Sequence, residues 1–251
     1  MSNTIRLKIK RQDAPGGPAR WEEFEVEREP KMNVIAALML IQRQPKTIAG
    51  KKTAPVVWDS NCLEEVCGAC TMLVNGRVRQ ACSTLVDKVS PRGEPVTLEP
   101  MTKFPVVRDL LVDRSSMFES LKRVKAWIEL DGSYDLGPGP RYSHDEQQVR
   151  YALSRCFTCG TCLEVCPNVN PKTSYMGPAA ISAARLMNLH PTGKMQAEER
   201  VEVLLGVGGV FDCGNSQNCV KACPKEVPLT TSLADMMRAA TKQSVIRWFR
   251  K

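Results

Sequence analysis

The chain has 251 residues, enough for two modest domains that each bury a core, and 43% of them are hydrophobic, as in an ordinary soluble protein. The net charge of +8 is spread among interleaved acidic residues and only 6% of residues are aromatic, which argues against a nucleic-acid partner. The N-terminus lacks the apolar segment of a signal peptide, and the longest apolar run, residues 34–41, is too short to span a bilayer. We expect a protein that is soluble by itself and reaches a membrane only through a partner.

Cysteine is the unusual residue in this composition. Eleven cysteines are too many for chance, and an odd number is poorly suited to a closed disulfide framework. The sequence therefore favours thiolate ligation of metal in a reducing compartment.

The first elements predict the beginning of a β-grasp domain. Residues 5–10 alternate between apolar and polar, as in a half-buried strand, and a turn-rich stretch at 13–18 separates them from a second strand at 21–26. Asn33 is a candidate cap for a helix that ends before Pro45.

A first set of cysteines follows with the spacing C-x4-C-x2-C…C, which is the plant-type signature for a [2Fe–2S] cluster. Gly68 and Ala69 are small enough to let backbone N–H groups approach anionic sulfur, and Asn75-Gly76 predicts a tight hairpin before the last cysteine. A four-cysteine zinc site is the alternative, although it usually has two CxxC pairs. The ligands predicted for this cluster are Cys62, Cys67, Cys70 and Cys82.

Strands at 84–89 and 96–98 are expected to complete the first domain. From Val106 onward the apolar spacing becomes helical, so we expect one domain at 1–113 and a helical one at 114–251. The second domain contains a predicted loop at 131–141, a capping box at Ser143 and Glu146, and three predicted helices, at 178–189, 195–205 and 232–249.

Two cysteine runs interrupt these helices. The first reads C-x2-C-x2-C-x3-C-P, the bacterial ferredoxin signature, in which the fourth cysteine ligates the other cluster. The second run has the same layout except that Ser216 stands where the second cysteine would be.

Reciprocal pairing of the runs predicts two clusters of different type. One has a complete thiolate set and is expected to be [4Fe–4S]; its ligands are Cys156, Cys159, Cys162 and Cys223. The other has three thiolates and is expected to lack the iron at one corner, as [3Fe–4S]; its ligands are Cys166, Cys213 and Cys219. The alternative is that Ser216 ligates a fourth iron through its alkoxide.

These assignments use every cysteine and describe an electron-transfer chain. No Ser-His-Asp set, Gly-rich phosphate loop or spaced carboxylate pair emerges, and His144 and His190 read as surface or helix-end residues. We therefore expect no organic active site on this chain.

A plant-type domain followed by a bacterial-ferredoxin domain, with the three clusters in this order and a cysteine missing at Ser216, resembles the iron–sulfur subunit of succinate dehydrogenase and fumarate reductase. The likeness covers essentially the whole chain, including residues 176–180. It implies an α+β protein of the respiratory chain and tricarboxylic acid cycle, the electron-transfer subunit of a succinate:quinone oxidoreductase. Electrons would pass from FAD through the three clusters to quinone, or in reverse for fumarate reduction.

The same resemblance implies the partners. A flavoprotein subunit would hold FAD and the dicarboxylate site, and a cytochrome b-type membrane anchor would hold quinone and often haem. Residues 63–65 depart from the family's Arg-Glu-Gly, Asn168–Pro171 replaces a stretch that often contains a tryptophan pair, and Gly214 replaces a histidine. The departure at residues 63–65 would alter the potential of the [2Fe–2S] cluster or its contact with the flavoprotein, and the other two favour a quinone site elsewhere, in a haem-containing anchor that uses menaquinone.

The C-terminus predicts a membrane-facing end. Trp248-Phe249 is an amphipathic pair among basic residues, so we expect this end to face the anchor at the cytoplasmic side of the cell membrane. Two other classes of protein are alternatives to this interpretation: a cluster subunit related to glycolate oxidase or heterodisulfide reductase, which generally has two complete runs, and a colourless zinc-stabilised binding module.

Overall fold

The computed structural model describes residues 4–129 and 141–250, and its chain divides into two compact units. The first unit comprises Met1–Arg114 together with Phe157–Thr161, and the second comprises Ser115–Cys156 together with Cys162–Lys251. The loop expected at 131–141 lies, except for its last residue, outside the described residues. Each unit is described by itself.

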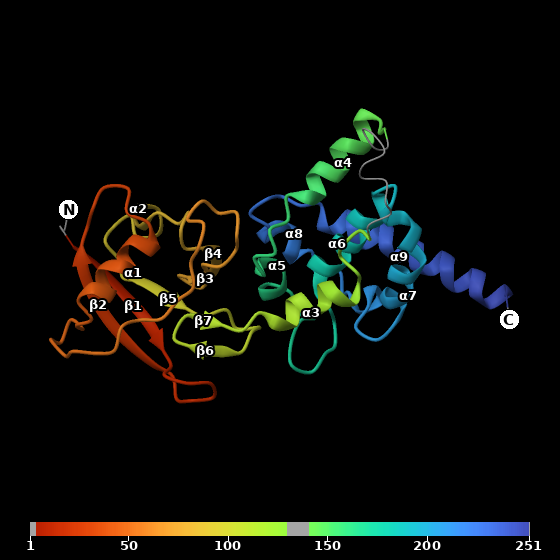
Figure 1. Ribbon diagram of the computed structural model, residues 1–251. Helices are drawn as coiled ribbons and strands as arrows, with labels where there is room; N and C mark the ends of the chain where they lie inside the picture. Colours follow the sequence, from red (N-terminus) through yellow and green to blue (C-terminus); the bar gives the residue numbers. More distant parts are fainter. Residues whose placement is uncertain (1–3, 130–140, 251) are drawn as a thin grey trace. The chain divides into compact units, whose positions relative to one another are not determined.

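A five-stranded mixed sheet forms the first unit (Figure 1). Its order is β2-β1-β5-β3-β4, with β1 and β5 parallel and the other neighbours antiparallel. The strands are β1 (Thr4–Arg11), β2 (Arg20–Glu27), β3 (Thr71–Val74), β4 (Arg77–Gln80) and β5 (Val96–Glu99). With the helix α1 (Val34–Arg43) packed on the sheet, this arrangement confirms the predicted β-grasp fold.

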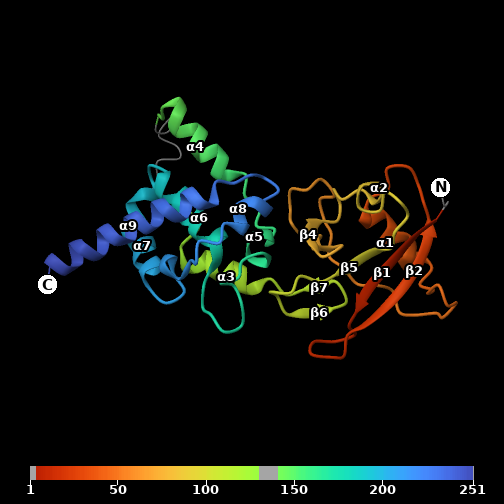
Figure 2. The ribbon, with the colours of Figure 1, turned by 180° about the vertical axis from the view of Figure 1, so that it is seen from behind.

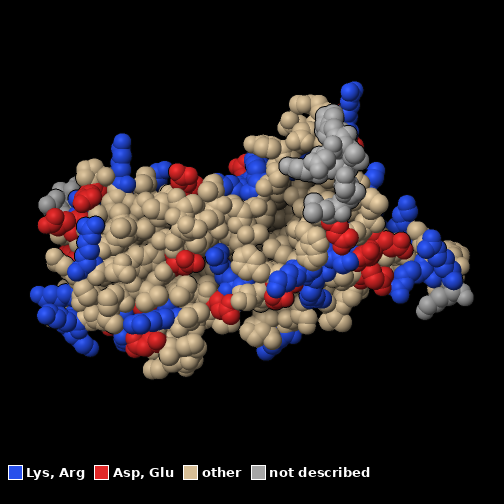
Figure 3. Space-filling view, in the orientation of Figure 1, with Lys and Arg blue, Asp and Glu red and all other residues tan. Residues whose placement is uncertain are grey.

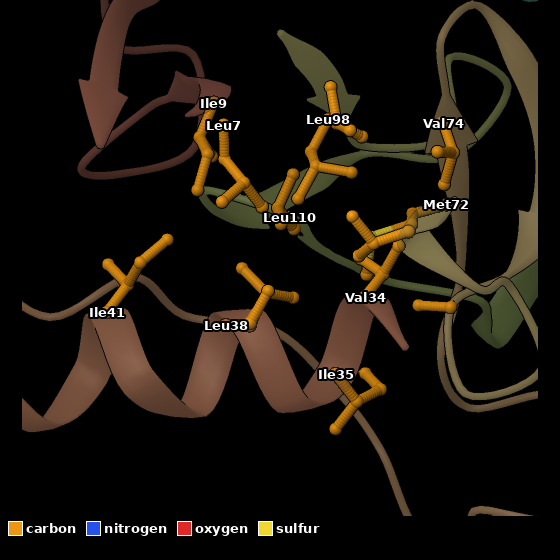
Figure 4. Close-up of a cluster of buried hydrophobic side chains, with 14 of the residues drawn as sticks. Leu7, Ile9, Val34, Ile35, Leu38, Ile41, Met72, Val74, Leu98 and Leu110 are labelled. Carbon is orange, nitrogen blue, oxygen red and sulfur yellow. The ribbon is translucent and has the colours of Figure 1, made fainter. Parts of the chain in front are cut away.

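The alternation in β1 places its apolar side chains on the face covered by α1. Figure 4 shows Leu38 and Ile41 of α1 facing Leu7 and Ile9 of β1, and all four are at most 1% exposed. Burying each such side chain contributes ~1.5–3 kcal/mol. The predicted cap is confirmed, because the Oδ1 atom of Asn33 accepts from the backbone N–H of Ala36 at 2.8 Å.

Asn33 also links this helix to the cysteine-bearing loop that follows β4. Its Nδ2 atom donates to the backbone carbonyl of Cys82 at 2.8 Å, and the backbone N–H of Val34 donates to the carbonyl of Thr84 at 3.0 Å. The helix that covers the sheet therefore also fixes the position of a candidate ligand.

Two predictions for this unit were wrong. Residues 84–89 do not form a strand: Val86–Val89 is the short helix α2, which turns Val86 and the half-buried Val89 toward the core at i and i+3. Short apolar runs fit either period, so the pattern alone could not separate them.

The second error concerns residues 106–112, where helical spacing was expected. They form a β-hairpin of β6 (Val106–Arg108) and β7 (Leu111–Val112). Asp109 at its turn has φ +49° and is fully buried. Its Oδ1 atom accepts from the Nε atom of Arg11 at 2.8 Å, and its Oδ2 atom accepts from the backbone N–H of Val57 at 3.0 Å. These long-range contacts hold the hairpin against the end of β1, and local spacing carries no sign of them.

The second unit is helical, as predicted. Figures 1 and 2 both show α6 and α7 alongside the long α9. Its α-helices are α3 (Ser115–Arg123), α4 (His144–Ser154), α5 (Thr161–Glu164), α6 (Gly177–Leu189), α7 (Ala197–Leu205), α8 (Asn218–Ala222) and α9 (Leu229–Phe249), and the 3-10 helices are η1 (Gly193–Gln196) and η2 (Val210–Asp212).

The core of this unit lies where α6, α7 and α9 meet. Its most buried side chains include Ile181, Ala184, Leu204, Met236 and Ala240. The capping box at Ser143 and Glu146 is present, and the histidines lie at helix ends as expected, His144 opening α4 and His190 closing α6. Among the described residues, no helix combines the length and apolar composition needed to cross a membrane.

The buried Arg11–Asp109 pair predicts a strong dependence of stability on Asp109. Asp109→Ala would leave the Arg11 guanidinium buried with less compensation, so we expect the free energy of unfolding of the holoprotein to fall by ~3–5 kcal/mol. Denaturant titration followed by far-UV circular dichroism measures this loss. Asp13→Ala is the control, since its ion pair with Arg20 is exposed and its loss should change little. Equal effects of the two substitutions would contradict the role given to Asp109.

Candidate metal centres

The loop from Cys62 to Cys70 is bent so that backbone N–H groups surround thiols. The N–H groups of Glu64 and Val66 each lie 3.4 Å from the Sγ atom of Cys62, and that of Ala69 lies 3.5 Å from the Sγ atom of Cys67. Left-handed φ angles at Leu63 (+59°), Glu65 (+58°) and Gly68 (+72°) produce this curvature. Such a cradle of N–H donors fits an anionic iron–sulfur group.

The other two thiols of this set flank the β3–β4 hairpin. Cys70 immediately precedes β3 and Cys82 follows β4, and the backbone N–H of Cys82 lies 3.5 Å from the Sγ atom of Cys70. Both are buried, whereas Cys62 and Cys67 are partly exposed. The Asn75-Gly76 turn, with φ +50° and +71°, is the predicted device that brings these two cysteines together.

The thiols in this loop differ in acidity. Hydrogen bonds from the backbone of Glu64 and Val66 lower the pKa of Cys62 to about 7, while burial raises the pKa of Cys70 to about 12. A bound metal deprotonates a ligating thiol through its own positive charge. The N–H donors around Cys62 therefore stabilise its thiolate in the protein alone, whereas Cys70 needs the charge of a bound metal to lose its proton.

Gly68 is the residue that this loop can least replace. A Cβ atom there would lie 2.5 Å from the Cα atom of Cys159, which belongs to the same unit, and the φ angle of +72° is unfavourable for other residues. This close approach is to the backbone of the loop that carries Cys159, so it constrains Gly68 in addition to the predicted approach of backbone N–H groups to sulfur.

A second group of thiols lies in the second unit, where the two cysteine runs are hydrogen-bonded to each other. The Nδ2 atom of Asn168 donates to the carbonyl of Asp212 at 2.9 Å, and that of Asn218 donates to the carbonyl of Val165 at 3.2 Å. These bonds bring the end of the first run beside the second. A small pocket between them is lined by Cys166, Tyr175, Cys213, Ser216 and Cys219.

The environment of this pocket is apolar and partly buried. Burial raises the pKa of Cys219, and the proximity of Cys166 and Cys213 raises it further. Burial also raises the pKa of Tyr175, with Cys213 as the next cause. Because three thiols share one small space, a positively charged metal group would relieve their mutual repulsion as thiolates.

The remaining cysteines are distributed between the units. Cys156, Cys162 and Cys223 belong to the second unit, where the guanidinium of Arg155 donates to the carbonyl of Glu226 at 3.3 Å. This bond joins the start of the first run to the end of the second. Cys159 belongs to the segment that groups with the first unit. The residues described contain no disulfide.

Tyr175 is a site residue that the sequence analysis missed. It precedes α6 and is 6% exposed, and its hydroxyl lies among the thiols of the second unit. It lies outside the helical periodicity and outside both cysteine runs, so neither spacing nor a motif could have revealed it.

The comparisons with known proteins agree with this geometry. Residues 6–119 match the model of a 2Fe-2S iron-sulfur cluster binding domain, and residues 151–227 match that of a 4Fe-4S dicluster domain. The chain is 56% identical to the succinate dehydrogenase iron-sulfur subunit of Bacillus subtilis over 98% of this chain and 96% of the relative. It is 28% identical to the fumarate reductase iron-sulfur subunit of Wolinella succinogenes, over 94% of this chain and 95% of that relative.

Among solved structures, a chain of the Mycobacterium smegmatis Sdh1 complex in the apo form has the same fold. Its TM-score is 0.76 and its sequence identity 24%, and the match covers 97% of this chain and 98% of that one. The match therefore includes the elements of both units.

The close approach at Gly68 predicts that Gly68→Ala loses the [2Fe–2S] cluster. The added methyl group meets backbone atoms and also requires a left-handed alanine, which costs ~1–2 kcal/mol by itself. Visible absorption and analysis of iron and sulfide measure the cluster content. Gly93→Ala is the matched control, because Gly93 has φ +83° but nothing within 4 Å of the added atom, so this variant should retain the cluster. A fully loaded Gly68→Ala protein would refute the steric argument.

Proposed function

The chain belongs to the family of succinate dehydrogenase iron–sulfur subunits, and from this premise we propose that it conducts electrons between the FAD of a flavoprotein subunit and a quinone bound in a membrane anchor. It is the cluster-carrying subunit of an oxidoreductase complex, with a 2Fe-2S and a 4Fe-4S domain. The dicarboxylate site belongs to the flavoprotein.

The observation that carries this proposal is the spacing of the cysteines in the sequence, which divides them into sets of different composition. The proposed [2Fe–2S] ligands are Cys62, Cys67, Cys70 and Cys82; the proposed [4Fe–4S] ligands are Cys156, Cys159, Cys162 and Cys223; and the proposed [3Fe–4S] ligands are Cys166, Cys213 and Cys219. The amide cradle around Cys62 supports the first set, and the bonds between the two runs support the reciprocal pairing of the others. Three one-electron centres suit the coupling of a two-electron donor to a distant acceptor.

The loop that carries Cys62 is also proposed as the flavoprotein contact. Leu63 and Val66 are 51% and 55% exposed, although both are apolar. Exposed apolar side chains beside a redox centre support a docking surface there, since a partner would bury them and exclude water from the path.

The region around Gly214 supports a quinone site elsewhere. A Cβ atom at Gly214 would lie 2.8 Å from the Oδ1 atom of Asn168, which is held by its bond to the carbonyl of Asp212. A histidine at position 214 would therefore displace Asn168. We propose that quinone binds in a haem-containing cytochrome b-type anchor and that menaquinone is the quinone.

The end of α9 is the proposed membrane-facing surface. Trp248 and Phe249 are 73% and 76% exposed, and their rings contact each other edge to face with centroids 4.8 Å apart. Basic side chains gather around this end on the face that Figure 3 shows. Aromatic and basic residues together favour an interface with anionic lipid headgroups, so we propose a peripheral position at the cytoplasmic face of the membrane.

Electron flow through these centres is reversible in principle. The likeness to the Wolinella succinogenes fumarate reductase subunit makes fumarate reduction the alternative physiological direction. The driving force between the flavin and the quinone decides the direction, and the order of the clusters is the same for both.

The function predicts activity only in the assembled complex. The isolated, cluster-loaded chain should give no succinate-driven dye reduction, whereas the membrane complex purified through a tag on this chain should reduce quinone with succinate. Turnover by the isolated chain, or a purified complex with neither succinate oxidation nor fumarate reduction, would contradict the proposal.

Ser216 predicts the type of the third cluster. Ser216→Cys would supply a fourth thiolate, so some or all of the site should become [4Fe–4S], with a lower reduction potential and slower quinone reduction. Oxidised [3Fe–4S] is paramagnetic, so its sharp EPR signal in the air-oxidised complex should diminish in this variant.

Ser216→Ala is the matched control for that experiment. It removes the hydroxyl without adding a ligand, so the signal should stay as in the wild type. A wild-type complex that has full iron content but lacks the signal would favour ligation by the serine alkoxide instead.

A further inference from the structure

The hydroxyl of Tyr175 is buried without a hydrogen-bond partner. The residue is 6% exposed, and its oxygen makes no hydrogen bond to any atom of the described chain. A buried hydroxyl left in this state typically costs ~1–3 kcal/mol, so such groups normally indicate a partner that completes the site. The phenol is a strong donor, and its surroundings identify what it would donate to.

Those surroundings are the thiols of the second unit. Tyr175 lines the same pocket as Cys166, Cys213 and Cys219, and after burial the thiol of Cys213 is the largest cause of the raised pKa of its hydroxyl. A neutral thiol is a weak acceptor, whereas a thiolate or sulfide of a metal cluster is anionic and accepts strongly. The hydroxyl thus lacks a partner in the protein alone and would gain one from a cluster held by these thiols.

The backbone fixes Tyr175 in this position. The backbone N–H of Met176 donates to the carbonyl of Gly208 at 2.9 Å, and the N–H of Gly208 donates to the Oδ2 atom of Asp212 at 2.9 Å. Asp212 in turn immediately precedes Cys213. The segment that carries Tyr175 and the segment that carries a candidate ligand are therefore held together by the same short chain of bonds.

We propose that Tyr175 is a positioning residue that donates a hydrogen bond from its hydroxyl to a sulfur atom of the [3Fe–4S] cluster and thereby raises the reduction potential of that cluster. The inference rests on the proposed function, because it needs the cluster assigned to Cys166, Cys213 and Cys219. Reduction adds negative charge to the cluster, so a donor to sulfur stabilises the reduced form more than the oxidised form. The effect should be confined to this cluster.

The test compares Tyr175→Phe with wild type in the complete membrane complex. Phenylalanine keeps the ring and removes only the donor. In an EPR-monitored redox titration, the equilibrium constant for reducing the [3Fe–4S] cluster should fall on the order of tenfold, which is ~59 mV toward negative potential for one electron. The potentials of the other two clusters should not change.

Tyr151→Phe is the matched control. Tyr151 lies on α4, is 61% exposed and does not line the thiol pocket, so its variant should leave all three potentials at their wild-type values. Pulsed EPR after exchange into D₂O gives a second readout: wild type should show one more deuteron coupled to the oxidised cluster than Tyr175→Phe, which keeps only the couplings from backbone N–H groups near Cys219.

The outcomes of this experiment separate the proposed hydrogen bond from its alternatives. A loaded Tyr175→Phe complex with an unchanged [3Fe–4S] potential would overturn it and would indicate that a buried water satisfies the hydroxyl. Failure of the proposed cluster assignment looks different, because the wild type itself would then lack the sharp oxidised signal. Should Tyr175→Phe not assemble, 3-fluorotyrosine installed at position 175 serves instead. Its more acidic phenol donates more strongly and should shift the potential positively, and the absence of that shift would overturn the inference.

Discussion

A thiolate buried in protein needs positive partial charge around its sulfur. In this chain, irregular backbone near the cysteines directs N–H groups toward sulfur atoms. Left-handed residues gather in the loops that carry cysteines: Leu63, Glu65 and Gly68 in the first, Thr158 and Gly160 in the second, and Asn215 and Gln217 in the third. Each non-glycine residue in this conformation costs ~1–2 kcal/mol. Binding of a metal group to thiolates can offset such costs, because ligation and folding are coupled.

The regular elements of the two units serve these loops as a frame. In the first unit, Asn33 caps α1 with one side-chain atom and holds the carbonyl of Cys82 with another, so the packing of the helix on the sheet also positions a candidate ligand. In the second unit, bonds made by Asn168 and Asn218 connect the cysteine runs directly. In all three cases an asparagine side chain donates to a backbone carbonyl of a residue that is distant in the sequence.

The sequence predicted those features that are encoded locally. The alternation of β1, the Asn33 cap and the Asn-Gly turn each involve residues a few positions apart, and the structure contains every one of these elements. The cluster ligands assigned from cysteine spacing stay a prediction. Residues 84–89 and 106–112 were assigned to the wrong elements because short apolar runs satisfy more than one period. Asp109 and Tyr175 went unnoticed because their importance comes from burial beside residues far away in the chain, which no local pattern records.

The proposed reciprocal pairing of the two cysteine runs has a consequence for biosynthesis. On the proposed assignment, Cys166 serves the cluster whose other ligands come from the second run, and Cys223 serves the cluster that begins with the first. The [3Fe–4S] centre can therefore not close until Cys219 has emerged from the ribosome, and the [4Fe–4S] centre must wait for Cys223. The thiols of the first run must wait, reduced and unligated, through the synthesis of α6 and α7. On that assignment, both of these centres would be completed late in synthesis, while the loop at Cys62–Cys82 is complete much earlier in the life of the nascent chain.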